Sequence, residues 1–195
     1  MTSDTILMNV DSPYLDNQFL IAMPGLADSY FARTVTYLCQ HNGDGALGIM
    51  INRPSALTIG DVMRQLDIAV LDASLEHTPV YIGGPVQPDR GFILHTASTP
   101  WGSTLRVSDT VSLTTSRDIL EAIASGRGPG KVLFALGYAG WSQGQLEDEM
   151  KDNAWLSVPA DDAVVFDVSA AERWRRSADL LGINISLLTA QAGHG

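Results

Sequence analysis

Short apolar runs bounded by Gly, Pro, Asn and Asp recur along the chain, a pattern that predicts strands rather than long helices. The runs that we expect to form strands are 19–23, 35–40, 46–51, 80–82, 91–95, 105–107, 111–113, 131–136 and 163–168. A Gly-containing segment of hairpin length, 41–45, joins the second run to the third. These two runs therefore predict a β-hairpin.

Four short polar segments have the spacing of a helix capping box, in which Ser or Thr precedes Asp, Glu or Gln by three residues. They begin at Thr58, Thr115, Ser142 and Ser169. The helices that they predict end near residues 66, 124, 153 and 182. In the third helix, Glu147 and Lys151 are spaced for a favourable i,i+4 ion pair. Because these helices do not alternate regularly with the strands, the pattern favours an α+β fold over a doubly wound parallel sheet.

The chain length of 195 residues is typical of one sizeable domain. No repeat or linker divides the sequence, so we expect a leader over residues 1–16 and a single domain over residues 17–195. One cysteine argues for a reducing compartment, and the N-terminus lacks the basic start of a signal peptide. The longest apolar run, 132–141, is about half as long as a membrane-spanning helix. We therefore predict a cytoplasmic protein without a membrane segment.

The formal net charge of −10, from 12 Lys and Arg against 22 Asp and Glu, restricts the possible partners. Nucleic-acid affinity depends on basic side chains that neutralise phosphates, so this charge argues against direct contact with nucleic acid. The densest basic cluster, Arg173, Arg175 and Arg176, leaves room for a local anion site. No metal-ligand or cofactor motif occurs, and we predict neither a metal nor a cofactor.

Cys39 and His41 form the sharpest reactive pair in the sequence. Two residues apart on a predicted strand, they would project from one face, where the imidazole could activate the thiol as a nucleophile. His95 is an alternative base for the same thiol. The other interpretation is that Cys39 packs in the core, because cysteine is among the most frequently buried residue types.

Gly83 and Gly84 follow a predicted strand and let the backbone approach a neighbouring group closely. Arg90 and His95 flank the next strand, so an anion could be held there. The alternative interpretation is a plain turn into an edge strand, with a nearby acid paired to Arg90.

Thr115 and Ser116 place hydroxyls at a predicted helix N-terminus, where free backbone N–H groups favour phosphate or carboxylate. The alternative is ordinary capping, in which Asp118 accepts hydrogen bonds from the same N–H groups. The two interpretations predict different roles for the same hydroxyls.

Eight sequence segments together resemble a known bacterial family. They are 19–24, 37–41, 45–48, 83–86, 90–95, 114–118, 136–141 and 144–147. In order and spacing, from Asn17 to the C-terminus, they are similar to the AlgH/YqgE family. The resemblance implies a single α+β domain in which a small, partly closed β-barrel and a bifurcated mixed sheet are surrounded by helices.

The same resemblance adds Tyr138 and Trp141 to the ligand-binding candidates and marks Glu147 as a motif position. Family members are often labelled transcriptional regulators, although the family supplies no agreed reaction. Three functions therefore remain open. The first, which we favour, is regulation through binding of a small anionic ligand or a protein partner. The second is an enzyme that uses Cys39 with His41 or His95, and the third is transcriptional regulation.

Overall fold

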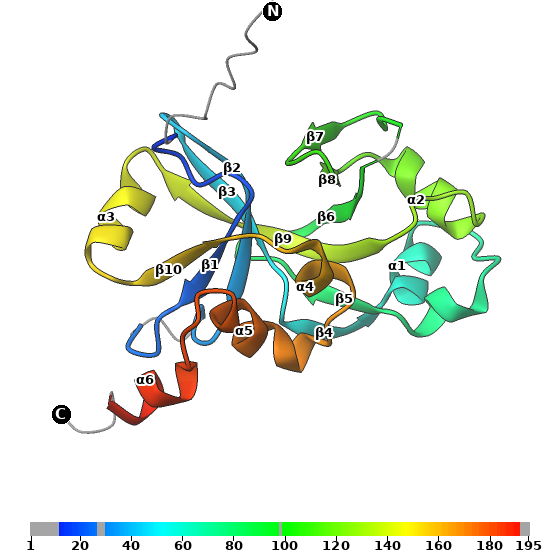
Figure 1. Cartoon of the computed structure of the whole chain (residues 1–195). Coiled ribbons are helices and arrows are strands. Elements are labelled where there is room, and N and C mark those ends of the chain that lie inside the picture. The colour runs from blue at the N-terminus through cyan, green and yellow to red at the C-terminus, as the bar shows by residue number, and fades with distance from the viewer. Residues whose placement is uncertain (1–11, 27–29, 98, 192–195) are drawn as a thin grey trace, which may run out of the picture.

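A branched sheet centred on strand β9 (Val132–Ser142) is the framework of the protein (Figure 1). The computed structural model describes residues 12–26, 30–97 and 99–191, and ten strands within them belong to this sheet. The other nine are β1 (Gln18–Ala22), β2 (Val35–Asn42), β3 (Gly45–Met50), β4 (Pro54–Thr58), β5 (Pro79–Ile82), β6 (Val86–Thr96), β7 (Thr104–Arg106), β8 (Val111–Thr114) and β10 (Trp155–Pro159). The main order across the sheet is β10-β1-β2-β3-β9-β6-β8-β7.

The sheet branches along β9. The first part of β9 pairs parallel with β5 and antiparallel with β6, whereas its last four residues pair antiparallel with β3. The predicted hairpin of β2 and β3 is confirmed by their antiparallel register. The curled, partly closed sheet with helices around it confirms the expected α+β fold.

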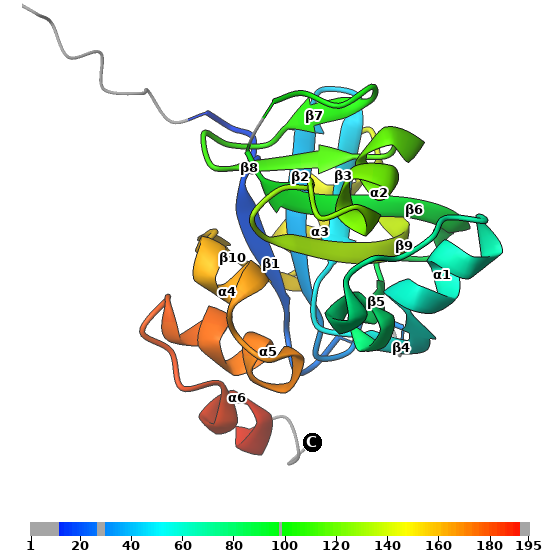
Figure 2. The same cartoon turned by 90° about the vertical axis from the view of Figure 1, so that its right-hand side faces the viewer.

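The helices gather at separate places around the sheet (Figures 1 and 2). They are α1 (Ile59–Gln65), the 3-10 helix η1 (Ala73–His77), α2 (Arg117–Ala124), α3 (Gln145–Lys151), α4 (Asp162–Phe166), α5 (Ala170–Asp179) and α6 (Ile185–Gln191). In Figure 1, α1 and α2 lie at one end and α3 at the opposite end, with α4, α5 and α6 below. Over the described ranges, no helix combines the length and apolar character needed to cross a membrane.

Apolar side chains divide into three buried clusters that fix these positions. The largest fills the curl of the sheet and includes Phe19 and Tyr37, with Val165 of α4 packed against them. A second cluster packs α1 and α2 against β6 and β9. A third joins Leu146 of α3 to Trp155 of β10 and to the neighbouring strands. The curl therefore has one face toward α4 and α5 and the other toward α3.

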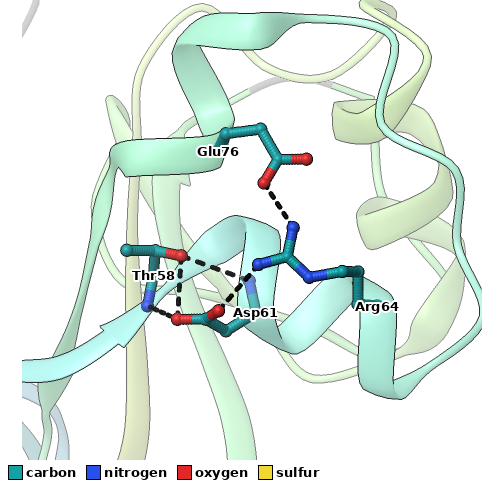
Figure 3. Close-up of polar contacts among 4 residues, drawn as sticks. All are labelled: Thr58, Asp61, Arg64 and Glu76. Atoms are coloured by element: carbon teal, nitrogen blue, oxygen red, sulfur yellow. Dashed lines mark hydrogen bonds and ion pairs between the residues drawn. The ribbon is translucent and has the colours of Figure 1, made fainter.

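The capping box predicted at Thr58 is confirmed (Figure 3). The Asp61 N–H donates to Thr58 Oγ1 at 3.2 Å, and the Thr58 N–H donates to Asp61 Oδ2 at 2.9 Å. Arg64 then donates to Asp61 Oδ1 at 2.7 Å and to Glu76 Oε2 at 2.6 Å. The hydrogen bonds from Thr58 are the main reason why the pKa of Asp61 is lowered. This network ties α1 to η1.

The other three capping boxes differ from their predictions. The N-cap of α2 is Ser116 rather than Thr115, and its side chain makes no capping hydrogen bond. The N-cap of α3 is Gly144 rather than Ser142, although the side chain of Gln145 accepts from the Ser142 N–H at 3.0 Å. Ser169 is the N-cap of α5 but makes no side-chain cap. The spacing therefore located the helix starts without specifying their hydrogen bonds.

The strand predicted over 163–168 is wrong, because this segment begins as the short helix α4. Asp161 stops the extended chain by accepting from the Ala163 N–H at 2.8 Å, and Val164 and Val165 are buried on the helix. β1 pairs with β2 on one side and with β10 on the other, and β10 was not predicted. A short apolar run does not distinguish a strand from a buried helical turn by periodicity alone.

Candidate functional site

Three of the predicted ligand-binding residues line one cavity of about 330 Å³, which we call the Arg90 cavity. They are Arg90 from β6, Thr115 from the segment before α2, and Tyr138 from β9. The remaining described lining residues are Leu47, Gln87, Phe92, Ser103, Thr104, Leu105 and Leu113. The cavity thus combines an apolar wall with one cation and several hydroxyls.

An irregularity in β6 brings Arg90 to this cavity. Val86 pairs with Tyr138 and Gly91 pairs with Leu136, so residues 87–90 bulge opposite the single residue Gly137. Gln87 has a φ of 47°, a left-handed conformation that costs roughly 1 kcal/mol for a residue with a side chain. In that conformation Gln87 Oε1 accepts from Arg90 Nη1 at 3.2 Å. The bulge therefore holds the guanidinium in place.

The Arg90 guanidinium also contacts the opposite wall of the cavity. Its Nη2 donates to Thr115 Oγ1 at 3.2 Å, and its Cζ lies 5.5 Å from the centroid of the Phe92 ring. The Thr115 hydroxyl donates in turn to Ser103 Oγ at 3.3 Å. A guanidinium carries five N–H donors, so donors remain for a further acceptor. No described residue that lines the cavity is a carboxylate, so the charge of Arg90 is not neutralised there.

A second cavity of about 580 Å³ adjoins the first, since Leu47 and Tyr138 line both. Its other described lining residues are Gln40, Asn42, Asp44, Gly45, Ala46, Val86, Gly140 and Trp141. We call it the hairpin cavity because the β2–β3 hairpin supplies most of this wall. The predicted candidate Trp141 therefore lies beside the hairpin cavity rather than the Arg90 cavity.

Gly83 and Gly84 have a structural partner outside both cavities. A Cβ on Gly84 would lie 2.0 Å from the carbonyl carbon of Tyr138, and one on Gly83 would lie 2.3 Å from the carbonyl oxygen of Gly137. The close approach expected at these glycines is therefore to the backbone of β9. Neither glycine is among the described residues lining the two cavities.

Ser116 likewise faces a protein partner. Its hydroxyl donates to Asp118 Oδ1 at 2.5 Å and accepts from the Ser103 N–H at 3.0 Å. Asp118 also accepts from the Gly102 N–H at 2.7 Å. The Ser116 hydroxyl and the Gly102 N–H lower the pKa of Asp118. These bonds hold the loop before β7 against the N-terminus of α2, while only Thr115 of the predicted hydroxyl pair reaches the Arg90 cavity.

Cys39 and His41 do not share a face, because β2 bulges between Leu38 and Gln40. Cys39 is 3% exposed and packs inside the curl with Tyr37. Burial raises the pKa of the Cys39 thiol, which favours the protonated form over the nucleophilic thiolate. The thiol lies 3.5 Å from the carbonyl oxygen of Tyr37.

His41 points to α3 instead. Its Nδ1 accepts from the Leu15 N–H at 2.9 Å, so the proton on Nε2 is donated to Glu147 Oε1 at 2.8 Å. The predicted ion pair of Glu147 with Lys151 is replaced by this contact, and Lys151 lies 3.6 Å from Asp148. His41 thus fastens residues 12–16 to the sheet; the rest of the expected leader, residues 1–11, lies outside the described ranges.

His95 is buried on the opposite face of β6 from the Arg90 cavity. Its Nδ1 lies 2.9 Å from the carbonyl oxygen of Thr96, and its Nε2 lies 2.8 Å from the Thr114 hydroxyl. Because a carbonyl only accepts, Nδ1 carries the proton and Nε2 accepts from Thr114. The Thr114 hydroxyl lies 2.8 Å from that of Thr104, which completes a buried chain.

Burial lowers the pKa of His95 below its ordinary value of about 6.5, and this predicts a pH-dependent stability. The folded protein holds the ring neutral, whereas the unfolded chain binds a proton near pH 6.5. The free energy of unfolding should therefore fall as the pH is lowered through 6.5, by at most about 1.4 kcal/mol per pH unit from this group. Urea unfolding of the His95→Gln variant from pH 7.5 to 5.5 should show less of this fall.

The exposed residue His77 provides the control, since His77→Gln removes a histidine without a buried partner. We expect His77→Gln to retain the pH dependence of the wild type. Equal pH dependence in wild type and His95→Gln would contradict the assignment.

Gln87, Phe92 and Ser103 also line the Arg90 cavity but were not among the sequence-based candidates. Proline on either side of Gln87, at positions 85 and 88, was an available signal, because proline within a strand marks an edge or a bulge. Ser103 carried no such signal, since only the pairing of β7 with β8 brings it to Thr115.

No group of three or more His, Cys, Asp and Glu side chains is arranged to hold a metal ion within the described part of the chain.

The family model described as AlgH-like matches residues 19–186. The chain belongs to the AlgH family. A UPF0301 protein of Methylococcus capsulatus is 60% identical to this chain, and the match covers 96% of this chain and 100% of the relative. The UPF0301 protein AlgH of Pseudomonas aeruginosa is 53% identical, with 96% and 100% covered.

Solved structures agree with this membership. The solution structure of the AlgH protein from Pseudomonas aeruginosa matches this AlgH-family chain with a TM-score of 0.80, at 53% identity and over 96% of this chain and 100% of that one. A crystal structure from Corynebacterium diphtheriae matches with a TM-score of 0.72 at 18% identity, covering 93% and 94% of the two chains. The second likeness extends to the fold alone.

Proposed function

We propose that this AlgH-family protein binds a small anionic ligand, through a carboxylate or phosphate group, at the Arg90 cavity. The observation that carries the proposal is a guanidinium held by Gln87 and Thr115 in a cavity whose described lining contains no carboxylate. In a chain of net charge −10, such a local positive charge favours an anion over a cation. Regulation would follow from ligand binding, without a chemical step.

The walls suggest how the rest of the ligand is held. Ser103 and Thr115 offer hydroxyls beside the guanidinium, and a planar guanidinium pairs with a carboxylate or phosphate through two parallel hydrogen bonds. Tyr138 and Leu105 supply apolar surface on other sides of the cavity. A volume of about 330 Å³ is at the small end of ligand sites, which favours a metabolite-sized molecule.

The test is an affinity comparison between wild type and Arg90→Ala. Thermal melting against inorganic phosphate, citrate and nucleoside monophosphates identifies a ligand, because a ligand at 100 times its Kd raises Tm by roughly 5 °C or more. Calorimetric titration of that ligand should then show an affinity about 10- to 100-fold lower for Arg90→Ala, the loss expected for a charge-assisted hydrogen-bond pair.

Arg127→Ala is the matched control, because Arg127 is exposed, its side chain donates to Ser125, and neither residue is among the described residues that line the cavity. It changes the net charge equally and should leave the affinity unchanged. Equal losses of ligand affinity in both variants would show that the net charge of the protein, rather than the position of Arg90, accounts for the loss. A ligand whose affinity survives Arg90→Ala would contradict the proposal, and a flat panel would direct attention to a protein partner.

The two alternatives have different expected results. An enzyme that uses Cys39 requires a thiol that alkylates in the folded protein with a pKa below about 8.5. The buried position of Cys39 in the core gives that alternative no support. Direct transcriptional control requires DNA binding that weakens steeply with salt, and the net charge of −10 opposes such binding.

A further inference from the structure

The carboxylate of Glu149 on α3 is held by three side-chain donors. Its Oε2 accepts from Trp141 Nε1 at 2.8 Å and from Trp155 Nε1 at 2.9 Å, and its Oε1 accepts from Gln145 Nε2 at 3.0 Å. The tryptophans come from β9 and β10, so the carboxylate joins two separate strands to the helix. Trp141 and Trp155 are 6% and 4% exposed, so both bonds from the indole N–H groups come from buried residues.

Beside this carboxylate lies a cavity of about 230 Å³ with aromatic walls, which we call the Glu149 cavity. Its described lining residues are Leu26, Phe31, Gly140, Trp141, Gln145, Glu149, Ala154 and Trp155. The rings of Trp141 and Trp155 meet at 78° with centroids 6.0 Å apart, and those of Phe31 and Trp155 meet at 77° with centroids 5.6 Å apart. Three aromatic residues whose rings meet at steep angles therefore line the space next to the carboxylate.

The charge of Glu149 has no cationic partner on the described residues. No Lys, Arg or His is among the described lining residues, and Glu149 belongs to none of the ion pairs seen over the described ranges. The indole and amide N–H groups supply dipoles but no compensating charge. A carboxylate accepts about four hydrogen bonds, so acceptor capacity remains after the three bonds from protein donors.

We propose that the Glu149 cavity binds a small organic ammonium group. A cation beside aromatic rings is stabilised by the ring quadrupoles, and methylated ammonium groups combine this attraction with apolar contact. A metal ion fits less well, because Ca²⁺ and Mg²⁺ require several oxygen ligands and the cavity offers one carboxylate and one side-chain amide. This site goes beyond the proposed anion site, since it takes a group of opposite charge from different residues.

The first experiment compares choline with its uncharged isostere, 3,3-dimethylbutan-1-ol, on the wild-type protein. The indole N–H resonances of Trp141 and Trp155 in a two-dimensional NMR spectrum report directly on the hydrogen bonds to Glu149. We expect choline to shift both resonances in a saturable manner and to bind at least about tenfold more tightly than the neutral alcohol. Equal affinities for the two compounds, or no saturable shift with choline, would overturn the proposal.

The second experiment separates the charge from the rings. Glu149→Gln removes the charge but keeps an acceptor for the indoles, and Phe31→Leu removes one ring without touching the three bonds to Glu149. We expect choline affinity to fall about tenfold in the first variant and about threefold or more in the second. Asp148→Asn is the control, because Asp148 is exposed on the same helix and does not line the cavity.

Choline affinity that is unchanged in both Glu149→Gln and Phe31→Leu would place binding elsewhere and refute the site. If Glu149→Gln fails to fold, the isostere comparison and the Phe31→Leu variant still decide between the outcomes. Neither measurement depends on an anion at Arg90, so failure of one site leaves the other standing.

Discussion

Gly84→Ala is expected to lose at least about 4 kcal/mol of folding stability, a large part of the roughly 5 to 15 kcal/mol that is typical of a folded domain. The added Cβ would lie 2.0 Å from the carbonyl carbon of Tyr138, 2.1 Å from its oxygen and 2.2 Å from the nitrogen of Ala139. All three are backbone atoms, so no side-chain rotation relieves the overlap. The strand that must move is β9, which holds β3, β5 and β6 in the sheet.

Equilibrium unfolding in urea measures this loss, and Gly25→Ala is the control. A Cβ on Gly25 would meet no atom within 4 Å, so that variant should remain within about 0.5 kcal/mol of the wild type. A Gly84→Ala protein that unfolds at the wild-type urea concentration would show that the two backbones separate easily. Such a result would contradict the close crossing of this segment and β9.

Gly84 packs against the backbone of Tyr138, a residue of the proposed site. Tyr138 lines both the Arg90 cavity and the hairpin cavity, and its backbone is the surface on which Gly84 rests. The sequence indicated that a close approach occurs at the glycine pair, but it did not indicate to which group. Pairing of β5 and β6 with β9 is a long-range feature, and it determines that the group is protein backbone rather than a ligand.

Register also explains why Cys39 and His41 do not share the face that regular strand alternation predicts, whereas the alternative interpretation, in which Cys39 packs in the core, is confirmed. A regular strand places residues two apart on the same face, and a single extra residue reverses that relation. Leu38 of β2 pairs with Gly48 of β3, and Gln40 pairs with the next residue, Leu47. Cys39 therefore has no paired residue on β3. Because neither residue type nor local spacing specifies such a bulge, the face of His41 followed only from the structure.

The site residues that the sequence did predict were recognisable from their local chemistry or from a family motif. Arg90, Thr115 and Tyr138 were named from local chemistry or from motifs of the family, and the structure places all three on one cavity. Trp141 was named in the same way, but its indole donates to Glu149, a residue that was not among the sequence-based candidates. Individual polar groups were thus visible in the sequence, whereas their partners depended on contacts between distant strands and helices.

The basic cluster of α5 illustrates the same dependence. Arg175 donates to Glu172 one turn earlier, so it is engaged on the surface of its own helix. Arg173 is 5% exposed and donates to the carbonyl oxygens of Ile51 and Val168. Helical geometry therefore directs Arg173 into the core and Arg175 to the surface, so these two guanidinium groups do not share an anion site.

Arg173→Ala is the second large loss that we expect, at about 3 to 5 kcal/mol. The guanidinium lies 5.0 Å from the centroid of the Tyr81 ring, and burial lowers its pKa without removing its charge at neutral pH. Truncation leaves the carbonyl groups of Ile51 and Val168 without their donor, and it opens a cavity between α5 and the sheet. Both effects destabilise the folded state.

Two further variants separate these causes in the same urea measurement. Arg173→Met fills most of the volume and removes the buried charge, so its loss should be smaller, at about 1 to 3 kcal/mol from the two carbonyl groups alone. Arg176→Ala changes the charge equally at an exposed position of the same helix and should cost less than about 0.5 kcal/mol. If Arg173→Ala and Arg176→Ala are equally stable, the buried guanidinium does not hold α5 to the end of β3. We expect Arg173→Ala to be the least stable of the three variants. That result would show that the buried Arg173, through its hydrogen bonds to the backbone, joins α5 to the sheet.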